Sequence, residues 1–451
     1  MASTHAISAS RMKELVNLYK TAAGYPFLKS MRVVGTEADR VFIQGWWSQR
    51  NLEMKTERRF LTNYYLNSDL TLVSTEFPVD CTTELMSSLT HDKRRQAVLR
   101  QVKEDTSTKQ FIEIWEQSRI VKNYDLAALN VHGDVYTDDS ITILSGIPDE
   151  LSPGQVLWTK GQDVIGVAWR HEPRHLGLVA CTNRHSWIFL WKNGEYRKLS
   201  PDGHAVHSPR LSPDGSYLVW LQREAGVVPH HNAHALVMRD LRLAEDHIHE
   251  IVEVVRTSKE INNGRQFYGI YGRLPNRCWT EDSQYLIFST PQKMNIVSYI
   301  VNLKTKAITE INNDRTSLMV GDVKDNIILF LHTSVNRPTG LIVGRFGSKA
   351  VEDGNVYLTS LTPLEFQVFK DIKLEPSDYS YDNDEEINQF NYIYVGPDSG
   401  EDKSVPMILI PHGGPHSNFA NTFSLDSMFF ALAGNKQLIK FIFIKLYLLI
   451  Y

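Results

Sequence analysis

The residues best suited to chemistry lie towards the end of the 451-residue sequence, where an apolar run leads into a glycine pair flanked by histidines. The run spans residues 405–410, and the motif follows Pro411 directly. The motif consists of His412, Gly413, Gly414, Pro415 and His416. Because glycine has no Cβ atom, a backbone N–H in such a turn can approach a negatively charged oxygen closely. The pattern predicts oxyanion stabilisation during acyl transfer; a tight turn that merely connects a strand to a helix is the alternative.

The partners that such chemistry needs are not present in the sequence. A strand followed by His-Gly-Gly is typical of the oxyanion loop of α/β-hydrolases, in which serine, acid and histidine follow in that chain order. After His416 the sequence holds Ser417, Ser424, Ser427 and Asp426 but no histidine, and Gly-x-Ser-x-Gly occurs nowhere. A serine hydroxyl without a base is a weak nucleophile. We therefore expect no catalytic residue in this chain and no hydrolysis by this mechanism.

The elements ahead of the motif read as an all-β region with an internal repeat. From about residue 38 to 391, short runs rich in β-branched and aromatic residues alternate with turn residues. Residues 211–220 align without a gap to residues 279–288, each an Asp-centred turn followed by an apolar strand. Residues 199–203 repeat the turn alone, and Trp169 marks a further copy. The spacing favours propeller blades of ~40–50 residues, with an insertion at residues 223–250.

Other local patterns predict individual elements. Residues 10–20 have helical spacing, with Ser10 as the N-cap and a Gly-Tyr-Pro stop at residues 24–26. The Asn193-Gly194 pair between two strand-like runs predicts a hairpin. Residues 90–117 look helical or irregular, and we expect them to be an inserted excursion.

The motif and the repeat together resemble the acylaminoacyl-peptidase branch of the prolyl oligopeptidase family. The resemblance rests on His-Gly-Gly-Pro-His after an apolar strand, on residues 208–214 and 278–283, and on the N-terminal helix. It covers roughly residues 8–434. It implies a mainly β fold: a β-propeller, by resemblance seven-bladed, preceded by a helix and followed by an incomplete α/β-hydrolase domain.

The resemblance divides the chain into four parts. The expected parts are an N-terminal helix (8–24), the propeller (25–385), the start of the hydrolase domain (386–434) and an atypical tail (435–451). The tail uses few residue types and resembles translated AT-rich non-coding sequence; a genuine strand, which would leave an open apolar edge, is the alternative. A membrane anchor is disfavoured because residues 438–451 are too short against the ~20 needed. Lysines also interrupt this stretch.

The resemblance also implies a function. Family members are serine exopeptidases that release N-acylated (acetyl or formyl) amino acids from the N-terminus of short peptides. By motif match, the N–H of Gly414 would serve the oxyanion hole, and His412 and His416 would shape the loop. The catalytic triad is expected beyond Gly434. A non-catalytic propeller that acts as an interaction or assembly partner is the alternative, and homo-oligomers are expected.

Charge, cysteine content and the N-terminal sequence argue against several other classes of protein. The net charge of −4 gives no electrostatic reason to expect a nucleic-acid partner. Three distant cysteines make no disulfide framework, and residues 1–10 lack a secretory pattern, which together predict a cytoplasmic protein without a membrane partner. No cofactor or metal is expected, because the histidine-rich stretch fits a solvated loop better than a zinc pattern. Its histidines are His230, His231, His234, His247 and His249. Trp46 and Trp47 are expected in the core.

Overall fold

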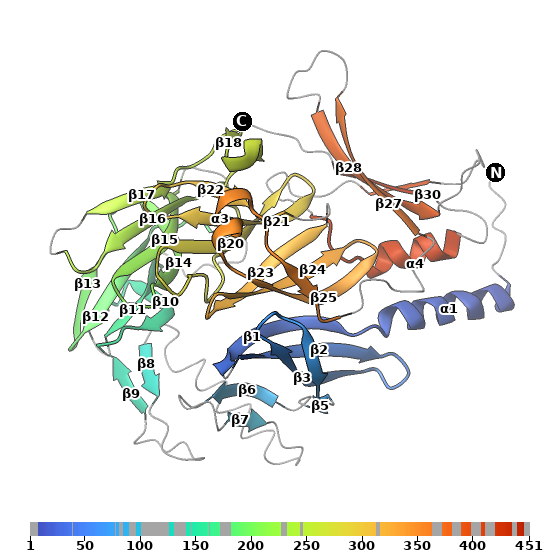
Figure 1. Ribbon diagram of the computed structural model, residues 1–451, viewed down its shortest axis with the longest axis horizontal. Coiled ribbons are helices and arrows are strands. Elements are labelled where there is room, and N and C mark those ends of the chain that lie inside the picture. The colour runs from blue at the N-terminus through green and yellow to red at the C-terminus, as the bar shows by residue number, and fades with distance from the viewer. Residues whose placement is uncertain are drawn as a thin grey trace. The chain divides into compact units, whose positions relative to one another are not determined.

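We describe the chain from a computed structural model, drawn as a ribbon in Figure 1. The structure describes residues 8–37, 39–76, 78–80, 84–89, 96–100, 126–129, 141–144, 146–161, 163–171, 182–226, 232–243, 247–312, 316–362, 372–380, 389–397, 407–410, 420–434 and 440–445. The chain forms two compact units. Unit 1 comprises Met1–Thr82, Ile287–Ile300 and Thr309–Tyr451, and unit 2 comprises Thr83–Leu286 and Val301–Ile308.

Unit 2 is built from antiparallel sheets whose strands follow one another in chain order. One four-stranded sheet contains β10 (Leu151–Trp158), β11 (Val164–Arg170), β12 (Ser186–Lys192) and β13 (Glu195–Lys198). A second contains β14 (His204–Leu211), β15 (Tyr217–Glu224), β16 (Ala235–Asp240) and β17 (Ile248–Val252). Three strand pairs complete the described part: β6 (Glu84–Leu89) with β7 (Gln96–Arg100), β8 (Leu126–Leu129) with β9 (Ile141–Leu144), and β18 (Lys259–Glu260) with β19 (Gln266–Phe267).

Unit 1 repeats the same up-and-down design. Its first sheet contains β1 (Phe27–Glu37), β2 (Arg40–Asn51), β3 (Thr56–Asn67) and β4 (Leu72–Thr75), and β5 (Val79–Asp80) also pairs with β3. Another contains β23 (Ser317–Lys324), β24 (Ile327–Ser334), β25 (Arg337–Arg345) and β26 (Leu358–Ser360). A three-stranded sheet of β20 (Tyr285–Gln292), β21 (Asn295–Asn302) and β22 (Ile308–Glu310) has residues in both units.

The described helices are few and short. They are α1 (Ala9–Ala23), the 3₁₀ turn η2 (Asn262–Gly264), α3 (Ser348–Asp353) and α4 (Leu425–Gly434). Among the residues described, no helix has both the length and the apolar character needed to cross a membrane. The fold is therefore mainly β, as the sequence predicted.

Apolar side chains from facing sheets make the core of each unit. In unit 2, Ile188, Val206 and Trp220 are at most 2% exposed and join the β10–β13 sheet to the β14–β17 sheet. In unit 1, Ile43 and Leu329 belong to a core between the β1–β4 and β23–β26 sheets. Trp47 lies in that core and stacks on Phe60, whereas Trp46 is half-buried. Strands covered in this way explain the dense Val, Ile and Phe runs of the sequence.

The first copy of the repeated turn connects β14 to β15. Ser212 Oγ donates to Asp214 Oδ1 (2.5 Å), which also accepts the Ser216 N–H (3.0 Å). Ser212 Oγ in turn accepts the Tyr217 N–H (2.9 Å), and Gly215 takes a φ of +80°. The predicted Asp-centred turn, with glycine at the left-handed position, is confirmed.

The second copy forms the same hydrogen bonds with different residues. Thr280 Oγ1 donates to Asp282 Oδ1 (2.6 Å), which accepts the Gln284 N–H (3.0 Å). Thr280 Oγ1 also accepts the Tyr285 N–H (3.1 Å), and Ser283, with φ +59°, stands where the first copy has glycine. The gapless alignment of the two segments therefore marks a true structural repeat.

Two details of the predicted repeat are wrong. Residues 223–250 are not an insertion, because β16 and β17 lie there as strands of the same sheet. The added length falls instead in the segment after β17 that carries the β18–β19 pair. Trp169 lies near the end of β11, the second strand of its sheet, whereas the first copy begins at the end of β14, the first strand of its sheet; Trp169 therefore does not open an earlier copy.

The other local predictions have mixed outcomes. The helix α1 is confirmed, but its N-cap is Ser8, whose Oγ accepts the Arg11 N–H (3.2 Å), and not Ser10. The Asn193-Gly194 hairpin between β12 and β13 is confirmed, with positive φ at both residues. Within residues 90–117 the structure describes only β7, which is a strand and not a helix; the rest lies outside the described residues.

Candidate active site

The His-Gly-Gly motif itself, residues 412–416, lies outside the described residues. The elements on either side of it are described. Before it runs β29 (Met407–Leu409), in the position of the predicted apolar strand. After it the chain is described again from residue 420, and the helix α4 follows.

The sheet that contains β29 is the one mixed sheet among those described. Its strand order is β27 (Ile372–Ser380), β28 (Gln389–Pro397), β30 (Lys440–Lys445) and β29. β27, β28 and β30 pair antiparallel, but β30 pairs parallel with β29. A parallel pair requires a crossover, and α4 lies between these two strands in the sequence. The segment from β29 to β30 is therefore a β-α-β unit, unlike the antiparallel sheets elsewhere.

β29 stands last in the described order of this sheet. A strand in residues 435–451 was expected to leave an open edge, whereas β30 pairs on both sides, with β28 and with β29. The prediction that residues 435–451 are not family sequence stays a prediction.

Two of the serines after the motif, Ser424 and Ser427, lie at the start of α4. Ser424 Oγ accepts the Ser427 N–H (3.3 Å) and lies 2.6 Å from Ser427 Oγ, so Ser424 caps the helix. Ser427 is 1% exposed, which removes its hydroxyl from solvent. Asp426 lies in the first turn and suits the positive end of the helix. These contacts give Ser424 and Ser427 no histidine partner; Ser417 lies outside the described residues.

The helix α4 is held from both sides within unit 1. Met428 and Ala431 are fully buried in one cluster with Ile393 of β28 and Ala22 of α1. The side chain of Tyr19 on α1 meets that of Phe429 edge to face, with 5.5 Å between ring centroids. Arg11 also donates to the carbonyl oxygen of Ala433 (2.5 Å), one of the terminal carbonyls that a helix leaves open. The N-terminal helix therefore packs on the element that follows the motif.

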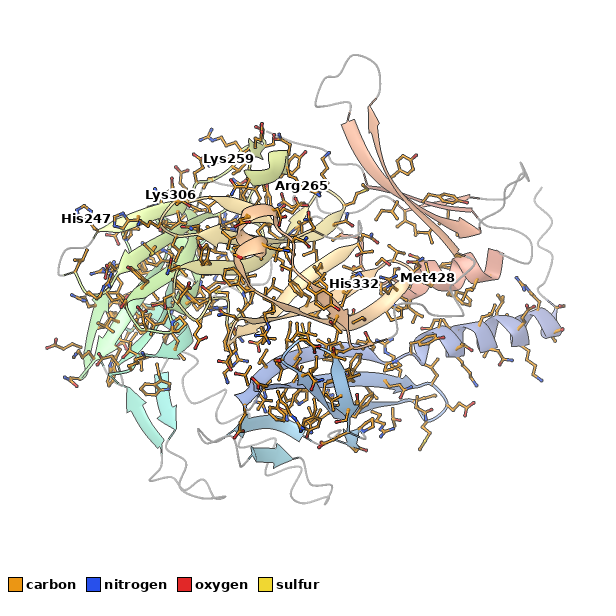
Figure 2. The ribbon with its side chains drawn as sticks, viewed as in Figure 1. His247, Lys259, Arg265, Lys306, His332 and Met428 are labelled. Atoms are coloured by element: carbon orange, nitrogen blue, oxygen red, sulfur yellow. The ribbon has the colours of Figure 1, made fainter. Side chains whose placement is uncertain are left out.

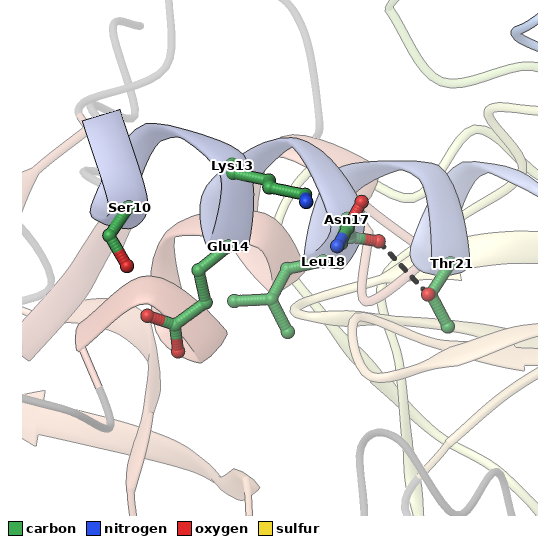
Figure 3. A pocket seen from close by; sticks show the side chains of 6 residues that line it. All are labelled: Ser10, Lys13, Glu14, Asn17, Leu18 and Thr21. Carbon is green, nitrogen blue, oxygen red and sulfur yellow. Dashed lines mark hydrogen bonds between the residues drawn. The ribbon is translucent and has the colours of Figure 1, made fainter.

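A surface hollow runs along α1 (Figure 3). Its lining residues all belong to this helix: Ser10, Lys13, Glu14, Asn17, Leu18 and Thr21. Figure 3 shows the bond that Thr21 Oγ1 donates to the Asn17 carbonyl oxygen (2.9 Å). No histidine, cysteine or pair of neighbouring carboxylates lines this hollow, so it lacks the groups for nucleophilic or acid–base chemistry.

A histidine pair that the sequence analysis missed lies in unit 2. The rings of His207 and His234 meet edge to face at 4.5 Å. His234 is 4% exposed and its Nδ1 donates to the Ile270 carbonyl oxygen (3.2 Å), so the expected solvated loop is wrong for this residue. Burial, together with the neighbouring positive charges, holds the pKa of His207 well below its usual value. Ser208 Oγ lies 3.0 Å from His207 Nδ1, but Ser208 is 1% exposed and out of reach of a substrate.

Two other histidines of that stretch, His247 and His249, are surface residues. His247 and His249 are exposed and stack on each other with 6.2 Å between centroids, as expected for a solvated segment. His230 and His231 lie outside the described residues. Within the described ranges, no three His, Cys, Asp or Glu side chains gather as metal ligands would.

Comparison with known proteins gives the family. The family model of the acylamino-acid-releasing enzyme, N-terminal domain, matches residues 3–145 and 139–360. The chain belongs to this family. Acylamino-acid-releasing enzymes of mouse and human are each 27% identical over 524 residues, which cover 92% of this chain and 70% of the relative. The pig enzyme is 28% identical over 527 residues with the same coverage.

A solved structure has a similar fold. An acylaminoacyl peptidase of Pyrococcus horikoshii superposes with a TM-score of 0.52 at 14% identity. The match covers 94% of this chain and 66% of the archaeal chain. The chain thus spans just under two thirds of that solved acylaminoacyl peptidase.

Proposed function

We propose that this chain is the propeller-bearing front part of a serine peptidase of the acylaminoacyl type. The up-and-down antiparallel sheets, each following the last along the chain, support a propeller, which we take to be seven-bladed by family resemblance. The β29–α4–β30 unit supports an α/β-hydrolase domain that begins near residue 386. We keep the domain limits predicted from the sequence: an N-terminal helix (8–24), the propeller (25–385), the start of the hydrolase domain (386–434) and the tail (435–451).

The proposed reaction is the release of an N-acylated amino acid from the N-terminus of a short peptide. One observation carries this proposal: the His-Gly-Gly motif directly follows β29 of a mixed α/β sheet, in a chain of the acylamino-acid-releasing enzyme family. In that position the N–H of Gly414 would donate to the oxyanion, while His412 and His416 would shape the loop. The substrate class is then an N-acylated peptide.

We infer further that these 451 residues do not hydrolyse peptides by themselves. The serines described after the motif are committed to the cap and first turn of α4. Ser208, whose hydroxyl lies beside the ring of His207, is buried. An activated serine needs an accessible hydroxyl with a base in hydrogen-bonding reach, and in turn an acid that orients the base. A propeller that acts only as an assembly partner is the alternative under test.

Sequencing the transcript across the codons for Gly434 and Asn435 tests the peptidase proposal. A reading frame that continues from α4 into a strand and later a Gly-x-Ser-x-Gly elbow, an acid and a histidine would support it. A message that stops after Tyr451 would contradict it, and the function would then have to be sought in binding.

A further inference from the structure

Asn421 stands out because it is a polar residue buried completely at the point where the chain leaves the motif region. Its side chain and backbone are 0% exposed. A buried amide must find hydrogen-bond partners, since leaving it without them costs about 1–3 kcal/mol. The hydrogen-bond partners of Asn421 therefore identify the segments of the chain that this residue connects.

Three of these hydrogen bonds reach two different hairpins of unit 1. The Asn421 Oδ1 atom accepts the Val335 N–H (2.9 Å), in the turn between β24 and β25. Its Nδ2 donates to Asn295 Oδ1 (3.1 Å), and its backbone N–H donates to the Met294 carbonyl oxygen (2.5 Å), at the turn between β20 and β21. One side chain therefore joins the tips of two hairpins that belong to separate sheets.

The next residues extend the contact along the β24–β25 turn. The Phe423 N–H donates to Thr333 Oγ1 (3.1 Å), and the Ser424 N–H donates to the Val335 carbonyl oxygen (3.3 Å). Thr333 is 1% exposed and its hydroxyl donates to the Arg337 carbonyl oxygen (2.9 Å), so the hydroxyl is fixed from both sides. Ser424 is also the cap of α4, which links the contact directly to the helix. In Figure 2 the labelled residues His332 and Met428 mark β24 and α4, the elements that this contact connects.

We propose that Asn421 is a positioning residue, which locks the described segment after the His-Gly-Gly motif onto the two hairpin tips and so fixes the start of α4. This proposal does not depend on the proposed function. A carboxylate at this position has no N–H to donate to Asn295 Oδ1, so aspartate would lose this hydrogen bond.

Hydrogen–deuterium exchange of the full chain, read by mass spectrometry, tests the lock without any need for catalysis. In Asn421→Ala we expect amides of α4 and of both hairpin tips to exchange about tenfold faster, because a buried set of hydrogen bonds is lost. Sheets of unit 2 should keep their rates. The matched control is Asn312→Ala, which removes an exposed asparagine bonded to the Asp353 carbonyl oxygen, and it should change none of these rates.

A second pair of variants separates a specific lock from general loss of stability. Thr333→Val removes the acceptor of the Phe423 N–H at nearly constant volume and should speed exchange in α4, whereas Thr333→Ser keeps the hydroxyl and should restore the parent rate. If Asn421→Ala does not fold, the comparison of Thr333→Val with Thr333→Ser still tests the proposal. Unchanged exchange in α4, equal acceleration in the serine and valine variants, or equal acceleration in the sheets of unit 2 would each overturn the proposal. A failed peptidase proposal would leave these results unaffected.

Discussion

Asp214 shows how one side chain can hold a turn in this fold. Burial alone would raise the pKa of its carboxyl, but the hydrogen bonds from Ser212 and Ser216 outweigh that effect and lower the pKa to about 2. An aspartate in an unfolded chain has a pKa of about 3.9. Because the folded pKa is the lower one, the turn contributes stability above about pH 4 that is lost as the pH falls towards 2.

We therefore predict a pH-dependent difference in stability between the parent chain and Asp214→Asn. We expect the urea midpoint of the parent to fall more steeply between pH 5 and pH 2.5 than that of the variant. The difference should stay below about 1 kcal/mol, because the carboxylate is exposed and its interactions are screened by water. Identical pH profiles for both proteins would contradict this role of Asp214.

At the scale of single elements, the β12–β13 hairpin depends on its two turn residues. Asn193 has a φ of +50° and Gly194 a φ of +87°, the combination that a two-residue turn needs to match the twist of the strands. A Cβ atom added at Gly194 would meet no atom within 4 Å. Any effect of a substitution there is therefore a backbone effect and not a clash.

We predict that Gly194→Ala lowers the free energy of unfolding by about 1 kcal/mol, measured by urea titration, because alanine disfavours positive φ. Gly347→Ala is the matched control. A Cβ atom there also meets open space, but its φ of −165° is extended backbone that any residue adopts. Equal effects of the two substitutions would show that the positive φ does not limit the stability of the hairpin.

The elements also show what could be predicted from the sequence and why. The turn at Asp214 and the hairpin at Asn193 depend on neighbouring residues only, so the residue types at these positions were enough to predict both. The strands β16 and β17 were taken for a polar insertion, because exposed residues such as His249 and Glu250 hide the strand pattern. The role of Asn421 could not be predicted, because its partners Asn295 and Val335 lie far from it in the sequence.

At the scale of the whole molecule, two kinds of sheet occur in one chain. Up-and-down antiparallel sheets make up unit 2 and much of unit 1, and a mixed sheet with a crossover helix follows near the motif. The family could be predicted from the sequence, because the features that identify it are local: a repeated turn, and a glycine pair after an apolar run. The motif residues 412–416 stay a prediction, since they lie outside the described residues.

We proposed that this chain carries the surroundings of a peptidase site but not its nucleophile. Treatment of the purified, folded chain with a fluorophosphonate probe tests this most directly, because the probe labels only an activated serine. We expect no labelling above that of the heat-denatured protein. Strong labelling that Ser417→Ala, Ser424→Ala, Ser427→Ala or Ser208→Ala abolishes would contradict this proposal, because it would place a working nucleophile within these residues.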